Sequence, residues 1–497
     1  MFFFSNTTGN AIKAVGVLAL LSLNIMGAAH AAEKAESLSI DVDALLEQNK
    51  LPGLSVAVVD DYELVYEQAF GVKEYGKPEA VDRHTAFSAA SISKAVTGLL
   101  AVMLAEEGAL DLDAPVSQYL KRWQLPENGF TKNTPITLGH LLTHTAGTSQ
   151  SGFADFFEGD DVPTLVESLN GIKLPRHKEP IKVMWEPGTR FQYSGGGYVI
   201  AQVAIEDETG KSLAALAEEM IFTPLGMKDT TMYQYGHPKF LKNVAKAHKL
   251  DRTLEGPGGV AVYPQTAASG LWTTPGDMAK LVLEIQKALA GRKTSVISKR
   301  VAVASTRVQT LKKAGGWSLG WMRYYAEGNL DWFAHSGYNS GIGGQVMATM
   351  QDGRAILVFG NGVHRSRVPS INAVVADVIK SRGWGQALPE ATEQPSDALL
   401  QSMVGWYENL NQGFFSPFGR KVMIYQKDGQ LLLDNSGGKY PPRKMVYNGN
   451  GRFVLDQFVN AQVGLSQTSE GSFLTFFRDG LEAYALKKVD PDLATGE

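Results

Sequence analysis

After the N-terminal segment, the hydrophobic residues first follow a strand-like pattern and then a helical one. Residues 54–59 and 63–70 are short runs rich in β-branched and aromatic side chains, and the polar residues between them predict a hairpin. From Ile92 to Glu107 the hydrophobic positions follow the 3.6-residue period of a helix, and Gly108 stands where a C-cap glycine belongs. Ser91 therefore lies at the start of a predicted helix.

Helices are predicted through the middle of the chain, and strands return after them. The predicted helices are Leu138–Thr145, Tyr198–Thr209, Leu213–Phe222 and Pro275–Ala290. Residues 344–350 and 355–360 are strand-like, with a turn at Asp352-Gly353 between them. Strands at both ends with helices between them predict an α/β or α+β domain in which distant segments close one sheet.

The C-terminal part has a different pattern. Residues 389–397 are polar, proline-bearing and aperiodic, which is typical of a linker. Two hairpin signals follow, around Asp428-Gly429 and Asp479-Gly480. We therefore predict a catalytic domain over residues 38–388, a linker over 389–397 and a small all-β barrel or sandwich over 398–497.

The N-terminus has the features of a signal peptide. Lys13 precedes an apolar run over residues 14–26, and Ala29-His30-Ala31 has the small-x-small pattern of a cleavage site. The run is shorter than the roughly 18 to 20 residues that span a bilayer, which favours cleavage after Ala31 over a retained anchor. We expect an exported protein, periplasmic or secreted, with no membrane span after cleavage of residues 1–31.

Composition narrows the function classes. The 497 residues are 44% hydrophobic and 20% charged, as in ordinary globular proteins. The formal net charge of -4 gives no electrostatic reason to expect nucleic-acid binding. Because the chain has no cysteine, disulfides, thiol catalysis and thiolate metal sites are excluded.

The sequence Ser91-Ile92-Ser93-Lys94 places a lysine three residues after a serine at the start of a helix. Three residues are nearly one turn, so the Lys94 amine is expected beside the Ser91 hydroxyl, which needs such a base to become nucleophilic. The helix N-terminus favours the alkoxide and the oxyanion that follows attack. A second Ser-x-x-Lys begins at Ser436, but it runs into Tyr440-Pro441-Pro442 and is expected in a loop. Ser91 is therefore the predicted nucleophile.

Several segments, in order along the chain, resemble class C β-lactamases and their DD-peptidase and esterase relatives. These are residues 87–99 around the nucleophile, then 136–147, 186–195, 224–227, 269–275 and 335–337. The resemblance covers about residues 50 to 365, and the block after Pro389 resembles a small barrel-like domain appended to some relatives. It implies a mostly antiparallel sheet with helices, an all-helical lobe, and acyl-enzyme chemistry with no metal or organic cofactor.

The resemblance also implies roles for individual residues. Tyr193 matches the tyrosine of the family's Tyr-x-Asn motif and would share the role of base with Lys94. Each group has a reference pKa of about 10, so one pKa must be lowered for a proton to be accepted near pH 7, and the sequence leaves open which. Gly195 stands where most relatives carry Asn, so the amide that would hold an acylamido substrate is missing. That absence argues against a β-lactamase.

His335-Ser336-Gly337 matches the family's Lys-Thr-Gly position and is closer to the His-Thr-Gly variant of some DD-peptidases. By that analogy His335 and Ser336 would bind a substrate carboxylate or polar tail. The backbone N–H groups of Ser91 and Tyr338 would form the oxyanion hole. A competing Lys293-Thr294-Ser295 lies in a polar stretch after a helix and is disfavoured.

Other conspicuous residues have a structural interpretation beside the functional one. His140 and His144 form half of a zinc pattern, but Leu141 replaces the glutamate of a zincin. Residues 195–197, three glycines, are interpreted as a tight turn before a helix. Trp272 and Trp317 line the substrate site or belong to the core, and Ser93 is expected on the helix surface or behind the site.

The leading hypothesis is an exported serine hydrolase that forms an acyl-enzyme on Ser91 with a small peptide, amide or ester substrate, for which a cell-wall peptide is one candidate. A peptide or D-amino-acid amide is favoured over an ester, and a β-lactam is placed third. Two alternatives come from other classes. One is a penicillin-binding or sensor protein that acylates without turnover, and the other is a metal-dependent hydrolase that uses His140 and His144.

Overall fold

The computed structural model describes residues 37–310, 316–326, 330–384, 394–408, 421–438, 441–449, 451–455, 458–468, 471–478 and 481–490. The predicted signal peptide, residues 1–31, lies outside these ranges. Within them, no helix combines the length and the apolar character that crossing a bilayer would require.

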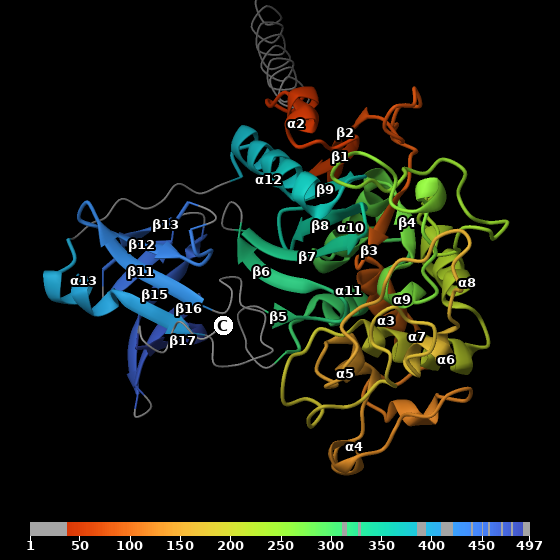
Figure 1. Ribbon diagram of the computed structural model, residues 1–497. Coiled ribbons are helices and arrows are strands. Elements are labelled where there is room, and N and C mark those ends of the chain that lie inside the picture. The colour runs from red at the N-terminus through yellow and green to blue at the C-terminus, as the bar shows by residue number, and fades with distance from the viewer. Residues whose placement is uncertain are drawn as a thin grey trace, which may run out of the picture.

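A seven-stranded antiparallel sheet forms the centre of the larger part of the molecule, in the order β2-β1-β9-β8-β7-β6-β5 (Figure 1). The strands are β1 (Gly53–Asp60), β2 (Glu63–Gly71), β5 (Gly316–Trp317), β6 (Met322–Ala326), β7 (Leu330–Asn339), β8 (Ile342–Thr349) and β9 (Ala355–Gly360). The N-terminal hairpin therefore pairs with a strand almost three hundred residues away, as the predicted closure by distant segments requires.

Both faces of this sheet are covered by helices. Along β1, Val56 and Val58 face a core shared with α2 (Val42–Gln48) and α12 (His364–Ser381), whereas Ala57 and Val59 face the main core. α10 (Pro275–Leu289) packs on the second face, against β1, β8 and β9. This two-sided burial explains why β1 is almost continuously hydrophobic rather than alternating.

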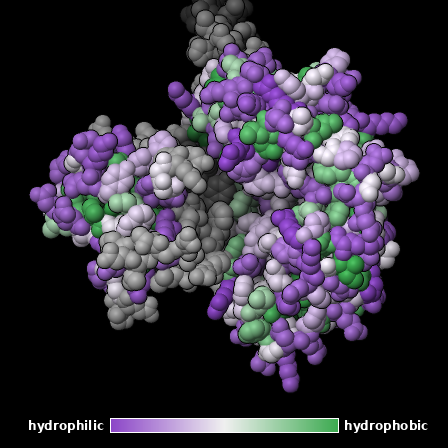
Figure 2. Space-filling model, viewed as in Figure 1, coloured by the Kyte–Doolittle hydropathy of each residue, from purple (hydrophilic) through white to green (hydrophobic). Residues whose placement is uncertain are grey.

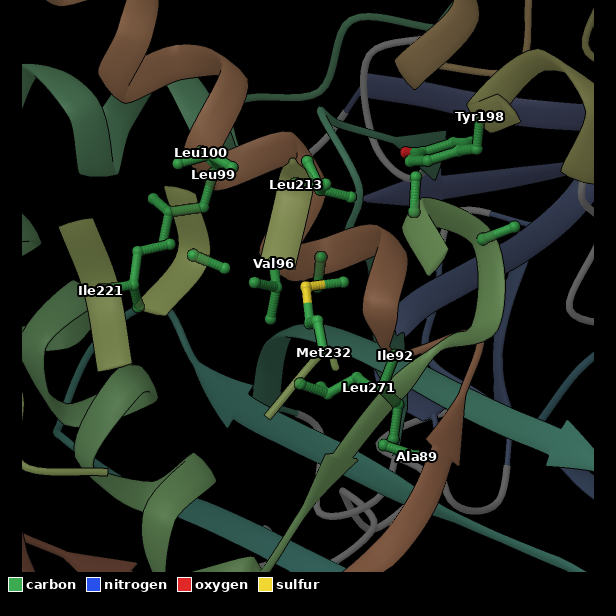
Figure 3. Close-up of a cluster of buried hydrophobic side chains, with 14 of the residues drawn as sticks. Ala89, Ile92, Val96, Leu99, Leu100, Tyr198, Leu213, Ile221, Met232 and Leu271 are labelled. Carbon is green, nitrogen blue, oxygen red and sulfur yellow. The ribbon is translucent and has the colours of Figure 1, made fainter. Parts of the chain in front are cut away.

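A helical lobe surrounds α3 (Ser93–Glu106), whose residues from Ser93 to Leu104 are all buried. Figure 3 shows α3 side chains packed with Leu213, Ile221, Met232 and Leu271 from other elements. The lobe also contains α4 (Gly129–Asn133), α5 (Leu138–Leu142), α6 (Leu165–Leu169), α7 (Gly195–Thr209), α8 (Leu213–Ala217), α9 (Thr266–Ser269) and α11 (Lys299–Thr306). Two 3-10 turns, Val116–Gln118 and Pro257–Gly259, complete it. A helix that is hydrophobic on all sides is expected in a core, and α3 lies in the centre of this lobe.

Two helices differ from their predicted bounds. α7 begins at Gly195, so the three glycines form its first turn instead of a turn before it, with the Ser194 hydroxyl accepting from Gly197 N as the N-cap. α5 ends at Leu142, because His144 has a left-handed φ of 59°. The predicted helix from Leu213 to Phe222 is found with those bounds, as α8 followed by a π-helical segment, Glu218–Phe222.

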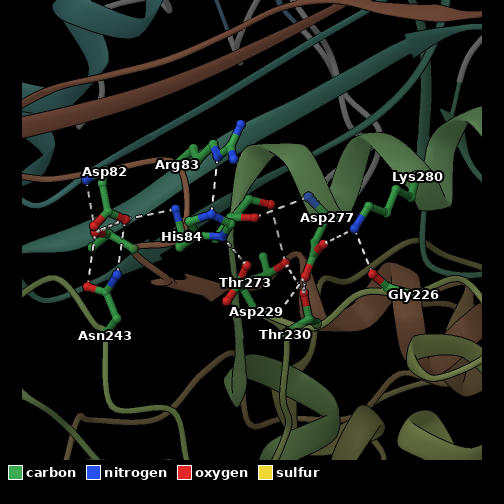
Figure 4. A network of polar contacts seen from close by, with 12 residues as sticks. Asp82, Arg83, His84, Gly226, Asp229, Thr230, Asn243, Thr273, Asp277 and Lys280 are labelled. Atoms are coloured by element: carbon green, nitrogen blue, oxygen red, sulfur yellow. Dashed lines mark hydrogen bonds and ion pairs between the residues drawn. The ribbon is translucent and has the colours of Figure 1, made fainter.

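A polar network joins the start of α10 to the neighbouring turn (Figure 4). The Asp277 carboxylate accepts from Asp229 N at 2.8 Å and from Thr230 Oγ1 at 2.9 Å, and it pairs with Lys280 Nζ at 2.7 Å. Asp277 N donates to Thr274 Oγ1 in turn. A buried carboxylate with this many partners is stable without a catalytic role, and we interpret the network as structural.

The C-terminal part is a closed antiparallel barrel that follows a short helix, α13 (Asp397–Met403). Its strands are β10 (Gly405–Glu408), β11 (Lys421–Lys427), β12 (Gln430–Asp434), β13 (Arg443–Tyr447), β14 (Arg452–Leu455), β15 (Phe458–Thr468), β16 (Gly471–Arg478) and β17 (Leu481–Val489). The predicted barrel and both predicted hairpins are confirmed. The sequence patterns did not reveal α13, whose first residue lies in the predicted linker, and residues 385–393 of that region lie outside the described residues.

On the face shown in Figure 2, hydrophobic side chains of the described residues are scattered among hydrophilic ones and form no single large patch. Isolated exposed hydrophobic residues are normal for a folded protein.

Candidate active site

The predicted nucleophile lies on the turn between β3 (Phe87–Ala90) and α3. Ala90 has a φ of 50°, a left-handed conformation that costs a residue with a Cβ roughly 1–2 kcal/mol. Ser93 holds the turn, since its hydroxyl donates to Ala90 O at 2.6 Å and accepts from Leu271 N of β4 (Leu271–Thr273) at 2.8 Å. Ser93 is thus buried behind the site and not on the helix surface, while Ser91 stays partly exposed.

Lys94 lies in the core directly behind Ser91. Its side chain is 2% exposed, and Nζ donates to Ser91 Oγ at 3.1 Å and to Ala268 O at 2.7 Å. Burial lowers the pKa of Lys94 to about 7. Near neutral pH a large fraction of this amine is therefore uncharged and able to accept a proton.

Tyr193 lies beside both Ser91 and Lys94. Its hydroxyl hydrogen-bonds with the Ser91 side chain, and Lys94 Nζ is 5.0 Å from the centre of its ring. Burial raises the pKa of Tyr193 above its ordinary value, and the bond with Ser91 offsets only part of that rise. Of the two groups that the sequence left open as the base, only Lys94 has a pKa displaced toward neutrality.

His335 lies on β7 with its side chain turned into the core. The side chain is 2% exposed, its ring contacts Trp317 at 5.4 Å, and Nδ1 is 2.7 Å from Ser336 O. Burial, followed by the nearby Lys94, lowers the pKa of His335 to about 3. A neutral imidazole has no charge to offer a carboxylate, so the geometry does not favour the predicted carboxylate-binding role of His335.

The residues that follow His335 in the motif, Ser336 and Gly337, and the next residue, Tyr338, alternate between the two faces of β7. A Cβ on Gly337 would lie 2.0 Å from Ala89 O, so only glycine allows β7 to approach β3 this closely. Ser336 is partly exposed. Tyr338 is 49% exposed on the opposite face to His335, with its ring 4.8 Å from the His364 ring of α12. The close approach at Gly337 sets the main chain of Tyr338 beside the turn that carries Ser91.

Gly195 is the position at which the family's amide side chain is missing. A Cβ there would lie 3.2 Å from Gly152 Cα, 3.3 Å from the Phe153 ring and 3.4 Å from Ser151 O. The segment 151–153 therefore occupies the space that a larger side chain would need. Sequence patterns gave no sign of this segment, because the contact joins parts of the chain that only the fold brings together.

The remaining candidates lie elsewhere or serve the packing. His140 and His144 both accept from main-chain N–H groups through Nδ1, from Thr137 at 3.3 Å and from Ser194 at 3.1 Å. Among the described residues no three His, Cys, Asp or Glu side chains cluster as metal ligands would. Trp272 is buried in the core, and Trp317, also buried, packs against Tyr193 at 5.6 Å.

The two competing motifs are not part of this cluster. Ser436 lies in a turn after β12, where its N–H and hydroxyl both donate to Asp434 Oδ1, at 2.7 and 2.8 Å, and Lys439 lies outside the described residues. Ser295 follows α10, and its N–H donates to Glu284 at 2.5 Å. Sequence reasoning missed Ala268 O, which belongs to the cluster, and it named His144 without placing its ring beside Tyr193. A carbonyl has no side chain to signal it.

A mostly antiparallel sheet with a helical lobe, and a serine, a lysine and a tyrosine gathered at the start of a buried helix, define a serine hydrolase of the β-lactamase and penicillin-binding class. The chain belongs to the Beta-lactamase family, whose model matches residues 41–380. This membership supports serine hydrolase activity and agrees with the resemblance in the sequence.

Two of the relatives are proteins of Staphylococcus aureus. A teichoic acid D-alanine hydrolase is 29% identical over 251 residues, which cover 50% of this chain and 57% of the relative. Protein flp of strain MW2 is 27% identical over 230 residues, covering 46% of this chain and 43% of the relative. The chain thus spans about half the length of the curated relatives it matches.

Solved structures extend the likeness over nearly the whole chain. The crystal structure of SurE superposes with a TM-score of 0.53 at 22% identity, covering 90% of this chain and 97% of that one. The octameric penicillin-binding protein homologue from Pyrococcus abyssi gives 0.55 at 22% identity, with 91% and 97% covered. At this identity the two structures show the shared fold alone.

Proposed function

We propose that this serine hydrolase releases short D-aminoacyl groups, of which D-alanyl is the first candidate, from ester or amide bonds through an acyl-enzyme on Ser91. The observation that carries the proposal is the contact of 3.1 Å between Lys94 Nζ and Ser91 Oγ, formed by an amine whose pKa burial lowers to about 7. The choice of acyl group is supported by the name of the staphylococcal relative and by the filled space at Gly195.

Acylation begins when Ser91 Oγ attacks the substrate carbonyl and Lys94 Nζ takes the hydroxyl proton. The oxyanion that forms lies toward the backbone N–H groups of Ser91 and Tyr338. The loss of one such donor raises the activation free energy of the chemical step by about 3 kcal/mol. Tyr193 keeps its proton, because burial raises its pKa. Its hydroxyl can then protonate the leaving group and be reprotonated by Lys94.

Deacylation reverses the proton path. Water attacks the carbonyl of the acyl-Ser91 ester while Lys94 Nζ takes one water proton, and Ser91 Oγ then leaves with the proton that Lys94 returns. The acid that is released carries the D-aminoacyl group. The buried amine thus gains and loses one proton in each half-reaction and ends as it began, so turnover requires no metal or organic cofactor in this scheme.

The substrate class follows from the surroundings of Gly195. Segment 151–153 occupies the space beside it, and no side-chain amide is present there to hold an acylamido group. An acyl group with an unsubstituted amino group does not need that amide. We therefore expect free D-aminoacyl substrates to react faster than their N-acylated counterparts, and β-lactams with acylamido side chains to be poor substrates.

A substrate comparison tests the proposal. Purified protein is supplied with a D-alanyl ester, the matched N-acetyl-D-alanyl ester, a D-alanyl-D-alanine peptide and benzylpenicillin, and kcat/KM is measured for each. We expect the free D-alanyl ester to exceed its N-acetylated form by about 10-fold or more, since one mismatched contact is worth about 1–3 kcal/mol. A clear preference for the N-acetylated ester or for benzylpenicillin would contradict the proposal.

Ser91→Ala is the control for that comparison. The variant should lose about 10⁴-fold or more in kcat, because removing a nucleophile leaves only binding and oxyanion stabilisation. Turnover of the D-alanyl ester that persists in the variant would belong to a different site or a contaminant.

We also propose that the protein acts outside the cytoplasm after removal of residues 1–31. The support is the pattern of Lys13, the apolar run and Ala29-His30-Ala31. Expression of the full chain followed by N-terminal sequencing of the periplasmic protein should give Ala32 as the first residue. An intact N-terminus recovered from the membrane fraction would indicate a retained anchor.

A further inference from the structure

We propose that His144 is a positioning residue that holds Tyr193 against Ser91 by accepting a hydrogen bond on Nδ1. The inference deepens the proposed function, on whose Ser91 acylation step it rests. It assigns a role in catalysis to a residue that does not itself touch Ser91.

His144 holds the chain on both sides of Tyr193. Its carbonyl accepts from Gln192 N at 2.7 Å, and its Nδ1 accepts from Ser194 N at 3.1 Å. Its ring lies against the Tyr193 ring, with centres 4.2 Å apart and planes inclined by 34°. His144 therefore contacts the residue before Tyr193, the residue after it and the Tyr193 ring itself.

His144 is itself rigidly placed. It is 1% exposed, and its φ of 59° puts it in the left-handed region. The rings of Tyr198 and Trp317 lie 5.2 and 4.9 Å from the imidazole, and Phe191 adds an edge contact at 5.8 Å. A side chain enclosed in this way transmits its position to its partners, as a support for a reactive group must.

The hydrogen bond fixes the protonation state of the imidazole. Because Nδ1 accepts from Ser194 N, the neutral ring carries its proton on Nε2, and Nε2 has no hydrogen-bond partner among the described residues. Leaving a buried polar group unpaired costs about 1–3 kcal/mol. An aliphatic or phenyl side chain would fill the same space without that cost, so the presence of an acceptor at Nδ1 points to the bond with Ser194 N as the reason for histidine.

The neighbouring charges are consistent with a neutral ring. Lys94 and His335 are the ionisable groups that act on His144, and burial, followed by these two, lowers its pKa well below the ordinary value. A protonated ring would turn Nδ1 into a donor facing the Ser194 N–H. The bond that aligns Tyr193 exists only with the uncharged imidazole.

Two isosteric variants separate the acceptor from mere bulk. In His144→Asn the side-chain oxygen can reach the position of Nδ1, whereas in His144→Gln the amide reaches toward the position of Nε2. The rate of Ser91 labelling by a fluorophosphonate reports acylation alone, and thermal unfolding reports stability. We expect His144→Gln to slow labelling by about 10- to 100-fold, the equivalent of one lost hydrogen bond and a misplaced phenol, and His144→Asn to recover it to within about 3-fold of wild type.

A double-mutant cycle with Tyr193→Phe tests whether His144 acts through Tyr193. If it does, His144→Gln should slow labelling by less than about 2-fold when Tyr193 is already Phe, because the hydroxyl that it positions is gone. An equal slowing in both backgrounds would overturn the proposal, and so would equal rescue by Asn and Gln.

The outcome is independent of the natural substrate. A protein that fails to hydrolyse D-alanyl esters but shows the coupling between His144 and Tyr193 would refute the proposed substrate and support the positioning role. Hydrolysis of D-alanyl esters without the coupling would do the opposite.

Discussion

Ser91 and Ser436 each begin a Ser-x-x-Lys sequence, yet the fold gives them different surroundings. Ser91 precedes α3, which is buried on all sides, and its hydroxyl accepts a hydrogen bond from Lys94 at 3.1 Å. Ser436 lies in a turn at the surface of the barrel, and its hydroxyl donates to Asp434 at 2.8 Å. Ser91 is thus paired with a buried amine that can act as a base. Ser436 is paired with a carboxylate that accepts a hydrogen bond from its hydroxyl.

The difference shows that the spacing of the motif has chemical meaning only when a buried helix removes the lysine from water. Burial lowers the pKa of Lys94 to about 7, and a lysine in solvent keeps a value near 10.4 and almost no free base at neutral pH. The spacing places the amine beside the hydroxyl, and the core makes the amine a base.

Replacing the buried amine should have the largest effect on this comparison. Lys94→Met keeps the length and apolar stem of the side chain but removes the base, and we expect kcat/KM to fall about 10³-fold, within the usual range for general-base catalysis. At the same time the variant should melt at a higher temperature at pH 7. The folded pKa lies below the ordinary value of 10.5, so protons favour the unfolded wild type throughout the range below 10.5.

Steady-state kinetics and calorimetry check both effects. Full activity in Lys94→Met would remove Lys94 from the mechanism, and a lower melting temperature would mean that the amine stabilises the fold.

The next largest difference is expected in stability, when a glycine near each serine, Gly337 or Gly438, is replaced by alanine. Gly337→Ala puts a Cβ 2.0 Å from Ala89 O, so β7 must shift away from β3, and we expect a loss of about 3 kcal/mol in the free energy of unfolding. Gly438, near Ser436, has a φ of 84° and open space around it. Gly438→Ala should cost only the roughly 1–2 kcal/mol of a left-handed alanine. Denaturant unfolding of the two variants compares them, and equal losses would contradict the close approach of β7 and β3.

The pH dependence of kcat/KM should reveal the depressed lysine. With a pKa of about 7, Lys94 is protonated and inactive as a base below neutrality, so kcat/KM should rise with pH through a midpoint near 7 and fall about 10-fold for each pH unit below it. Because the pKa of Tyr193 is raised, no second rise from phenolate is expected in the neutral range. A kcat/KM that does not change from pH 6 to 8 would contradict Lys94 as the base.

The smallest effect is expected at the second motif. Asp434→Ala removes the acceptor for Ser436 N, Ser436 Oγ and Gly438 N, and it should lower stability by about 1 kcal/mol, as the loss of a capping residue does. Labelling of Ser91 by a fluorophosphonate should be unchanged. A parallel loss of labelling would connect the barrel to the catalytic serine.

Much of the fold could be predicted from the sequence because the signals are local. The hairpin of β1 and β2, the helix after Ser91, and the β8–β9 and barrel hairpins all follow from hydrophobic periodicity and turn residues. The start of α7 was missed, since glycine is a poor helix former and its use there depends on the Ser194 cap and on close neighbours. α13 was missed because a short helix beside a linker has little periodicity to reveal it.

The candidate site was predictable only in part, because only some of its contacts join residues that are close in the sequence. The spacing of Ser91 and Lys94 is a property of one helix turn, whereas the burial of His335, the segment opposite Gly195 and the contacts of His144 join residues far apart in the chain. A carboxylate-binding role for His335 was a reasonable expectation from the motif. The pKa of about 3 follows from surroundings that no motif contains.

Intact-protein mass after exposure to a fluorophosphonate tests the central claim, that Ser91 and not Ser436 is the nucleophile. Wild type and Ser436→Ala should each gain the mass of one phosphonyl group, and Ser91→Ala should gain none. A mass gain that survives in Ser91→Ala, or one that disappears in Ser436→Ala while the protein remains folded, would contradict the assignment.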